Sequence, residues 1–237
     1  MIGTEKERAL HAALKQYFEP DPAYHEIPCR GYIADILRNN TIVEIQTRSL
    51  GALRDKLKAF LPDYHVTVVH PIACEKTITV VDEETGGVLY TRRSPKKGKP
   101  LDAVRELYRI RPFLGDPNLD ISLVLLNVEE YRQTDRKHKK SRRGFVRVER
   151  LPKEILSVLT LSSPADYRKT FLPDGLPDPF TVSDLRQKIG GTNSDCGTLM
   201  LILSSIGAAE RIGKRGNAYL YRIPGDREDR DRIHVTV

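Results

Sequence analysis

The sequence predicts an α/β fold followed by a smaller α+β domain. Helical and β-prone segments alternate over the first ninety residues, four prolines interrupt the chain between residues 162 and 179, and a helix–helix–hairpin pattern follows. We therefore divide the 237 residues into a first domain at 1–160, a linker at 161–179, a second domain at 180–224 and a polar tail at 225–237.

The first domain begins with a predicted helix at residues 5–18, because Thr4 and Glu7 have the spacing of a capping box and apolar residues then recur at helical period. Short β-prone runs occupy residues 24–47. A second helix starts after Ser49 and stops at Pro62. The remaining expected elements are a buried strand at 65–70, a hairpin of 77–81 with 88–91, a helix at 101–110 and a buried strand at 121–127.

The composition indicates a globular protein. Hydrophobic residues make up 39% of the chain and charged residues 30%, which is enough apolar material for a core. No run approaches the roughly 18 apolar residues of a membrane-spanning helix, and the first residues mix acids with bases, unlike a secretory signal. The three scattered cysteines fit free thiols in a reducing compartment. We expect a cytoplasmic protein without a membrane partner.

The positive charge is concentrated in one segment. Of the net charge of +7, the excess lies in residues 91–150, which hold 17 Lys and Arg against 8 Asp and Glu. Its two dense runs are expected to bind the phosphate backbone of a nucleic acid through Arg92, Arg93, Lys96, Lys97, Lys139, Lys140, Arg142 and Arg143. The alternative is a pair of solvated loops that keep the protein soluble.

Asp35 and Glu44 are acidic residues within two apolar runs of the β-prone segment that precedes the second helix. If Asn39 and Asn40 form a two-residue hairpin loop, Asp35 falls directly opposite Glu44 on one face. Like charges at this separation repel, so one acid is protonated, both reach water, or a cation lies between them. Mg²⁺ is commonly held by such a pair, and metal-assisted phosphodiester cleavage needs this arrangement beside a segment that attracts polyanions.

This order of elements resembles the αβββαβ core of the PD-(D/E)xK, or restriction-endonuclease-like, nuclease superfamily. The resemblance covers residues 4–71 and, by the order of elements, extends to about 150. It implies a mixed sheet in which Asp35 and Glu44 bind Mg²⁺ or Mn²⁺. Gln46 takes the position that is usually lysine and would orient the attacking water, and Glu7, or else Glu5, would complete the site. Such nucleases often pair to cut both strands, so a homodimer is a possible partner arrangement.

Each candidate residue has a structural alternative. Glu7 can be the glutamate of the capping box, and Gln46 can be a polar residue on a solvent-facing side of a strand. For Asp35 and Glu44 the alternative is weaker, because acids among apolar strand residues are unfavourable unless paired or ligating. A helix histidine such as His11 is more often packed against its neighbours than used as a proton carrier. The spacing of His65, His70 and Cys74 fits no closed zinc site.

The last third of the chain, about residues 165–224, resembles a winged helix-turn-helix. Two predicted helices, at 180–189 and 193–206, precede a hairpin of 209–212 with 218–223. The second helix has no Lys or Arg, so base readout by it is not expected, whereas Lys214 and Arg215 in the hairpin are expected to contact the nucleic-acid backbone. The alternative is a winged helix used for protein contact or dimerisation.

Taken with these resemblances, the sequence predicts a divalent-metal-dependent nuclease that hydrolyses phosphodiester bonds in nucleic acid, with DNA as the expected substrate. A non-catalytic DNA-binding protein on a degenerate nuclease scaffold is one alternative. A winged-helix module for protein interaction is another.

Overall fold

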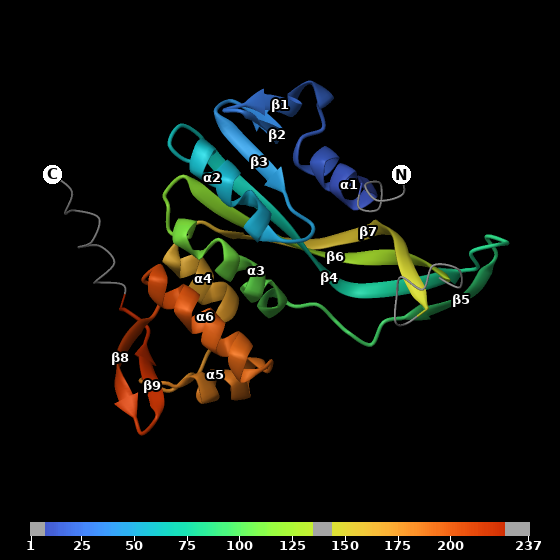
Figure 1. The fold of residues 1–237 in the computed structure, drawn as a ribbon. Coiled ribbons are helices and arrows are strands. Elements are labelled where there is room, and N and C mark those ends of the chain that lie inside the picture. Colours follow the sequence, from blue (N-terminus) through green and yellow to red (C-terminus); the bar gives the residue numbers. More distant parts are fainter. Residues whose placement is uncertain (1–7, 135–143, 226–237) are drawn as a thin grey trace.

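The computed structural model describes residues 8–134 and 144–225 and has an α/β architecture with a mixed β-sheet (Figure 1). The helices are α1 (Arg8–Phe18), α2 (Arg54–Phe60), α3 (Val104–Arg109), α4 (Pro164–Phe171), α5 (Val182–Ile189) and α6 (Asn193–Ser205). Short 3-10 turns at Leu50–Leu53 and Pro100–Ala103 lead into α2 and α3. The strands are β1 (His25–Cys29), β2 (Tyr32–Arg38), β3 (Thr41–Ile45), β4 (His65–Val81), β5 (Val88–Arg93), β6 (Leu119–Thr134), β7 (Phe145–Leu161), β8 (Glu210–Arg215) and β9 (Ala218–Arg222).

The main sheet has the strand order β1-β2-β3-β4-β6-β7, with β5 paired to β4 outside this path. Strands β1, β2 and β3 form an antiparallel meander. The crossover through α2 makes β4 parallel to β3, and the crossover through α3 makes β6 parallel to β4. Strand β7 returns antiparallel to β6. The meander therefore ends at β3, next to the long central strands.

The three longest strands reach beyond the helices as an arm. One edge of β4 pairs first with β3, over residues 65–69, and then with β5, over residues 77–81. The far ends of β4, β6 and β7, together with β5, extend away from the helical part of the molecule (Figure 1). Tyr90 on β5 contacts Phe145 on β7, with ring centroids 6.5 Å apart, although two strands separate them in the sheet. The arm is therefore strongly curled.

Each face of the sheet is covered by its own apolar cluster. On one face, Leu10 and Leu14 of α1 pack against residues of β2, β3, β4 and β6, including Ile36, Ile45 and Val69. On the other face, α2 and α3 share a larger cluster with α4, α5 and α6. The helices of the C-terminal unit therefore pack into the core of the sheet domain.

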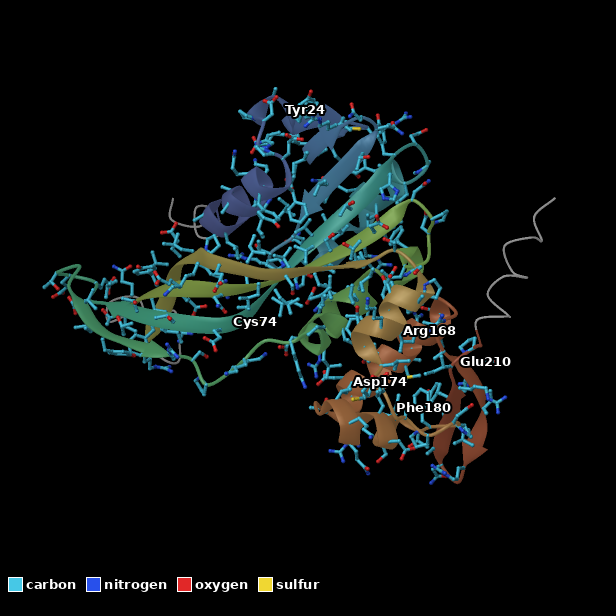
Figure 2. All side chains as sticks on the ribbon, turned by 180° about the vertical axis from the view of Figure 1, so that it is seen from behind. Tyr24, Cys74, Arg168, Asp174, Phe180 and Glu210 are labelled. Carbon is cyan, nitrogen blue, oxygen red and sulfur yellow. The ribbon has the colours of Figure 1, made fainter. Side chains whose placement is uncertain are left out.

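The C-terminal unit is built from α4, α5, α6 and the β8–β9 hairpin. Capping boxes start all three helices, with Ser163, Thr181 and Thr192 as the N-caps. Phe180 precedes α5 beside the hairpin, where it pairs with Tyr221 of β9 (Figure 2). The segment 161–179, which the prolines predicted to be a linker, contains α4. Pro164 is the first residue of this helix, a position where the missing N–H of proline has no consequence.

The structure confirms the α/β class and most expected elements. The two strands predicted at 65–70 and 77–81 form one strand, β4, and the structure also contains β7, which was not predicted from the sequence. Asn39 and Asn40 both have positive φ and form the two-residue turn of the β2–β3 hairpin, as predicted. Among the described residues, no helix has the length and hydropathy needed to cross a membrane.

Candidate functional site

The β2–β3 ladder opens at the two acidic residues. The register pairs Arg38 with Thr41 and Ile36 with Val43, so the next positions along the hairpin are Asp35 and Glu44, as predicted. At this point the two carboxyl groups, in place of backbone carbonyl oxygens, lie opposite the N–H groups of the neighbouring strand. The Ile45 N–H donates to Asp35 Oδ2 at 2.8 Å, and the Asp35 N–H lies 3.4 Å from Glu44 Oε1. Each acid is thus fixed to the neighbouring strand.

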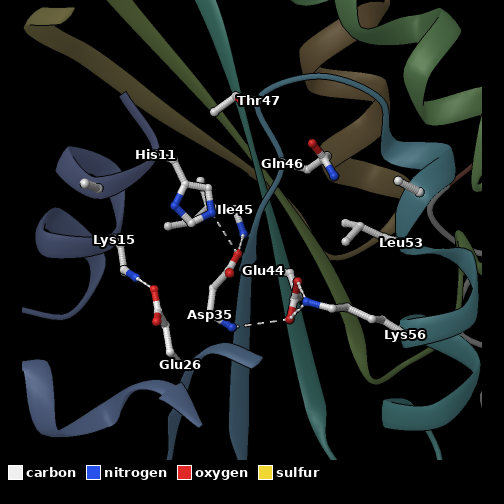
Figure 3. Close-up of a pocket in the computed structure, with 12 residues that line it drawn as sticks. His11, Lys15, Glu26, Asp35, Glu44, Ile45, Gln46, Thr47, Leu53 and Lys56 are labelled. Atoms are coloured by element: carbon white, nitrogen blue, oxygen red, sulfur yellow. Dashed lines mark hydrogen bonds and ion pairs between the residues drawn. The ribbon is translucent and has the colours of Figure 1, made fainter. Parts of the chain in front are cut away.

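A cavity of about 770 Å³ lies at this opening, between α1 and α2 (Figure 3). Three pairs of acidic and basic side chains line it. They are His11 with Asp35, Lys15 with Glu26, and Lys56 with Glu44. The bases come from α1 and α2 and the acids from β1, β2 and β3. Gln46 and Thr47, which follow β3, complete the wall.

Asp35 is held in the ionised form. His11 Nε2 donates to Asp35 Oδ2 over 3.2 Å, and the same oxygen accepts the Ile45 N–H. Burial of the carboxyl group opposes ionisation, but these two hydrogen bonds and the nearby positive charge lower the pKa of Asp35 below its usual range. Asp35 therefore presents a negative charge to the cavity.

Glu44 has the opposite tendency. Its side chain is only 2% exposed, and burial together with the charge of Asp35 raises the pKa of Glu44 to about 7. Lys56 opposes this rise, with Nζ 2.7 Å from Oε2 and 3.0 Å from Oε1. The two carboxyl groups thus lie in one cavity, where the pKa of Asp35 is lowered and the pKa of Glu44 is raised. Such divergent pKa values are frequent in functional sites.

The backbone of Gln46 is fixed by β4. Its N–H donates to the Val69 carbonyl oxygen at 2.9 Å, and its own carbonyl oxygen accepts a 2.7 Å hydrogen bond from Nδ1 of the buried His70. The side-chain oxygen of Gln46 accepts the Arg48 N–H at 3.2 Å. Gln46 lines the cavity that contains Asp35 and Glu44, so three of the four residues expected at the site lie together.

The fourth expected residue, Glu7, lies outside the described residues, as does the alternative Glu5. In the described part of the first helix, His11 and Lys15 face the cavity instead. From the sequence, His11 was expected to be a packed helix histidine, and no role was predicted for Lys15, Glu26 or Lys56. A signal for the two helix residues was present, because His11 and Lys15 are four positions apart and each directly follows an apolar stripe residue.

The predicted phosphate-binding residues fall on separate surfaces. Arg92 and Arg93 are exposed on β5, whereas Lys96 and Lys97, in the loop that follows, pair with Asp102 and Glu75. Lys214 and Arg215 are exposed on β8. Lys139, Lys140, Arg142 and Arg143 lie outside the described residues. The arm and the β8–β9 hairpin are thus two places where cations reach the surface.

Comparison with known proteins assigns the family. Residues 8–162, more than half of the chain, match a family model described as a domain of unknown function, DUF8091. The chain belongs to this family. The DUF8091 domain contains the whole cavity and ends where β7 ends.

The sequence similarity also extends beyond that domain. The chain is 34% identical over 228 residues to a protein of Treponema pallidum (strain Nichols) described as uncharacterized. The alignment covers 95% of this chain and 89% of the relative. No solved structure matches.

Proposed function

We propose that this protein is a divalent-metal-dependent nuclease whose active site is the cavity of Asp35 and Glu44. The observation that carries the proposal is the meeting of these two carboxylates at the opening between β2 and β3. Hydrolysis of phosphodiesters needs a cation that stabilises the charge developing on the phosphate, and carboxylates on adjacent strands are suitable ligands.

The order of elements supports a relationship to the PD-(D/E)xK nucleases. Helix α1, the antiparallel meander β1–β2–β3, the crossover helix α2 and the parallel strand β4 follow the αβββαβ pattern. In the C-terminal unit, α5, α6 and the β8–β9 hairpin follow the order of a winged helix-turn-helix. The proposed protein is therefore a PD-(D/E)xK-like nuclease domain followed by a winged helix-turn-helix.

The donor groups suit a hard cation such as Mg²⁺ or Mn²⁺. Among residues 8–134 and 144–225, no three His, Cys, Asp or Glu side chains form a metal-binding group. Two carboxylates nevertheless meet the usual requirement of Mg²⁺, which keeps several waters and often binds phosphate oxygens. A carboxylate offers about four lone-pair sites, so Glu44 can bind a cation beside Lys56.

The chain's own residues would share the remaining tasks. Bound at this pair, the metal ion would act as a Lewis acid towards the phosphate and lower the pKa of a bound water. The resemblance predicts a lysine at the position that Gln46 occupies. Lys56, which comes from α2, supplies a positive charge in the same cavity. Gln46 would orient the attacking water, and His11 keeps Asp35 in position.

One observation favours a second candidate, a non-catalytic nucleic-acid-binding protein. Both oxygens of Glu44 already accept hydrogen bonds from Lys56, so the buried acid is compensated without a metal ion. In that case the acid pair is structural, and the exposed cations of β5 and of the β8–β9 hairpin carry the function.

A cleavage assay with matched variants separates these candidates. Wild type is expected to cut fluorescently labelled DNA only with Mg²⁺ or Mn²⁺. Asp35→Asn and Glu44→Gln should each lose several kcal/mol of charge stabilisation, a fall of at least about 100-fold in rate. The control is Asp55→Asn, which removes an exposed carboxylate one residue from Lys56. RNA is tested in parallel to identify the substrate.

The outcome of binding in EDTA completes the test. If the Asp35→Asn and Glu44→Gln variants bind as wild type does while only wild type cuts, the nuclease proposal stands. If wild type binds but never cuts with either metal, the non-catalytic candidate replaces it. If wild type neither cuts nucleic acid with either metal nor binds it, both candidates are contradicted and a protein-interaction module remains.

A further inference from the structure

The β8–β9 hairpin carries four cations that the structure holds in two different ways. All six residues of β8 are exposed, and the hairpin projects from the C-terminal unit (Figure 1). Its cations are Arg211, Lys214, Arg215 and Arg222. Two of them are held by carboxylates and two by an aromatic ring, and this difference decides which charges remain available to a ligand.

Arg215 and Arg222 are tied back to the body of the unit. Arg215 Nη2 lies 3.6 Å from Asp184 Oδ2 on α5, and Arg222 Nε lies 3.3 Å from Asp178 Oδ1. Each of these ion pairs offsets one positive charge with one negative charge. They fix the hairpin against α5 and the segment that leads into it, but they contribute little net field towards an approaching anion.

Arg211 and Lys214 are held by the ring of Tyr219. The Arg211 guanidinium carbon lies 4.6 Å from the ring centroid, and Lys214 Nζ lies 4.8 Å from it. Lys214 stands directly opposite Tyr219 in the hairpin register, and the bulge after Arg211 brings that residue to the same ring. A neutral aromatic ring attracts a cation without cancelling its charge. The charges of Arg211 and Lys214 therefore remain available to an anion, and the ring already partly orders both side chains.

The helix that would enter a groove in a helix-turn-helix protein has no such charge. The exposed residues of α6 are Asn193, Ser194, Leu201, Ser204 and Ser205, none of them basic. The other side of α6 is fixed in place, because Leu199, Met200 and Leu203 belong to the core that α3 shares. An ion pair of Arg105 with Asp195, at 2.7 Å, adds to this attachment.

We propose that Arg211, Tyr219 and Lys214 form a contact site for the phosphate backbone of a nucleic acid, and that Arg215 and Arg222 serve to anchor the hairpin. This inference rests on the nucleic-acid substrate of the proposed function but not on catalysis. It divides four neighbouring cations into a binding pair and an anchoring pair, and it assigns Arg215, which the sequence predicted to contact nucleic acid, to the anchor.

Two double variants that remove the same charge from the same hairpin test the division. Binding of a short fluorescein-labelled DNA duplex is followed by anisotropy in EDTA, over a series of salt concentrations. Arg211→Gln with Lys214→Gln should weaken binding on the order of tenfold near 0.1 M salt and reduce the slope of log K against log salt by about 2. Arg215→Gln with Arg222→Gln should leave that slope close to the wild-type value.

A third variant, Tyr219→Leu, tests the ring. It keeps all four cations, so the salt slope should stay near that of wild type while the affinity falls several-fold, because Arg211 and Lys214 must now be ordered on binding. Circular dichroism and thermal melting establish that each variant is folded.

Three results would overturn the inference. Equal losses in both double variants would mean that the hairpin acts through its total charge, and no loss in either would mean that it does not bind nucleic acid. In both cases wild-type cleavage can persist, so the proposed function survives. If wild type ignores DNA and RNA but sediments with anionic lipid vesicles, the hairpin recognises a membrane surface and the proposed function fails as well.

Discussion

At the scale of single residues, the site depends on what each acid contacts. The sequence predicted that Asp35 and Glu44 face each other, because a two-residue Asn39-Asn40 turn determines the register, and the structure confirms this register. The sequence did not show that His11 and Lys56 would partner these acids. Both bases come from helices whose position depends on packing against opposite faces of the sheet, which no local pattern specifies.

The pH dependence of stability should report on Glu44. Its pKa rises from 4.5 to about 7 on folding, so the folded state binds the proton more tightly and wild type loses stability as the pH rises between these values. We expect the unfolding free energy of wild type to fall by roughly 2 kcal/mol relative to Glu44→Gln between pH 5 and 8. Urea denaturation measures this difference, and parallel pH profiles would contradict it.

Lys56 should be needed most when Glu44 is ionised. Lys56→Met leaves a buried carboxylate without its cation, which costs about 3 kcal/mol at pH 8. At pH 5 the carboxyl group is protonated and the cost should be much smaller. The same urea series tests this change, with Lys58→Met, which alters an exposed lysine of the same helix, as the control. An equal loss at both pH values would show that Lys56 acts through packing alone.

At the scale of elements, two segments show where a local interpretation was insufficient. Strand β7 contains Pro152 and many charged residues, features that argue against a strand. It is an edge strand with several bulges, paired only with β6, and such a strand tolerates both features. Helix α4 was missed for a similar reason. The prolines suggested a break in regular structure, but Pro164 directly follows the N-cap Ser163 and is the first residue of the helix.

A buried carboxylate, that of Glu130, stabilises the arm. Glu130 on β6 has a 3% exposed side chain and contacts Lys76, Arg132 and Arg150 at 3.2, 2.6 and 3.2 Å. Burial opposes its ionisation, but the hydrogen bond from Arg132 and the charge of Lys76 lower the pKa of Glu130 to about 2. Its stabilising contribution is therefore present above about pH 4.5 and is lost as the pH falls towards 2.

Replacing this carboxylate should loosen the arm. Glu130→Gln removes the charged partner that three cations share and should cost about 3 kcal/mol at neutral pH, with the difference from wild type shrinking below about pH 4.5. Hydrogen exchange should show faster exchange of amides at residues 76–80 than in wild type. Exchange that increases equally in α5 and α6 would mean that Glu130 supports the whole molecule and not the arm.

At the scale of the whole molecule, the sheet domain and the C-terminal unit share one core. The prolines of residues 161–179 predicted a boundary between two separate domains, and nothing in the composition indicated that the two would share a core. The apolar faces of α3 and α6 meet nevertheless, so Leu107 and Leu203 belong to one buried cluster. This sharing places the β8–β9 hairpin at a fixed position relative to the sheet.

Unfolding should therefore be a single cooperative transition. Leu203→Ala in α6 should lower the stability of the whole chain by roughly 2 to 5 kcal/mol. Two buried thiols allow each part to be followed, Cys29 in the sheet domain and Cys196 in α6. Both should become reactive towards a thiol reagent at the same urea concentration, in wild type and in the variant. Labelling of Cys196 well before Cys29 would show two independently folding units.

The central claim is that Asp35 and Glu44 together bind a divalent cation, and Mn²⁺ tests it most directly. Crystals soaked in Mn²⁺ should show an anomalous density peak between the two carboxylates, which disappears in Asp35→Asn. Absence of the peak at a Mn²⁺ concentration that supports cleavage, with Glu44 still paired to Lys56, would contradict the account.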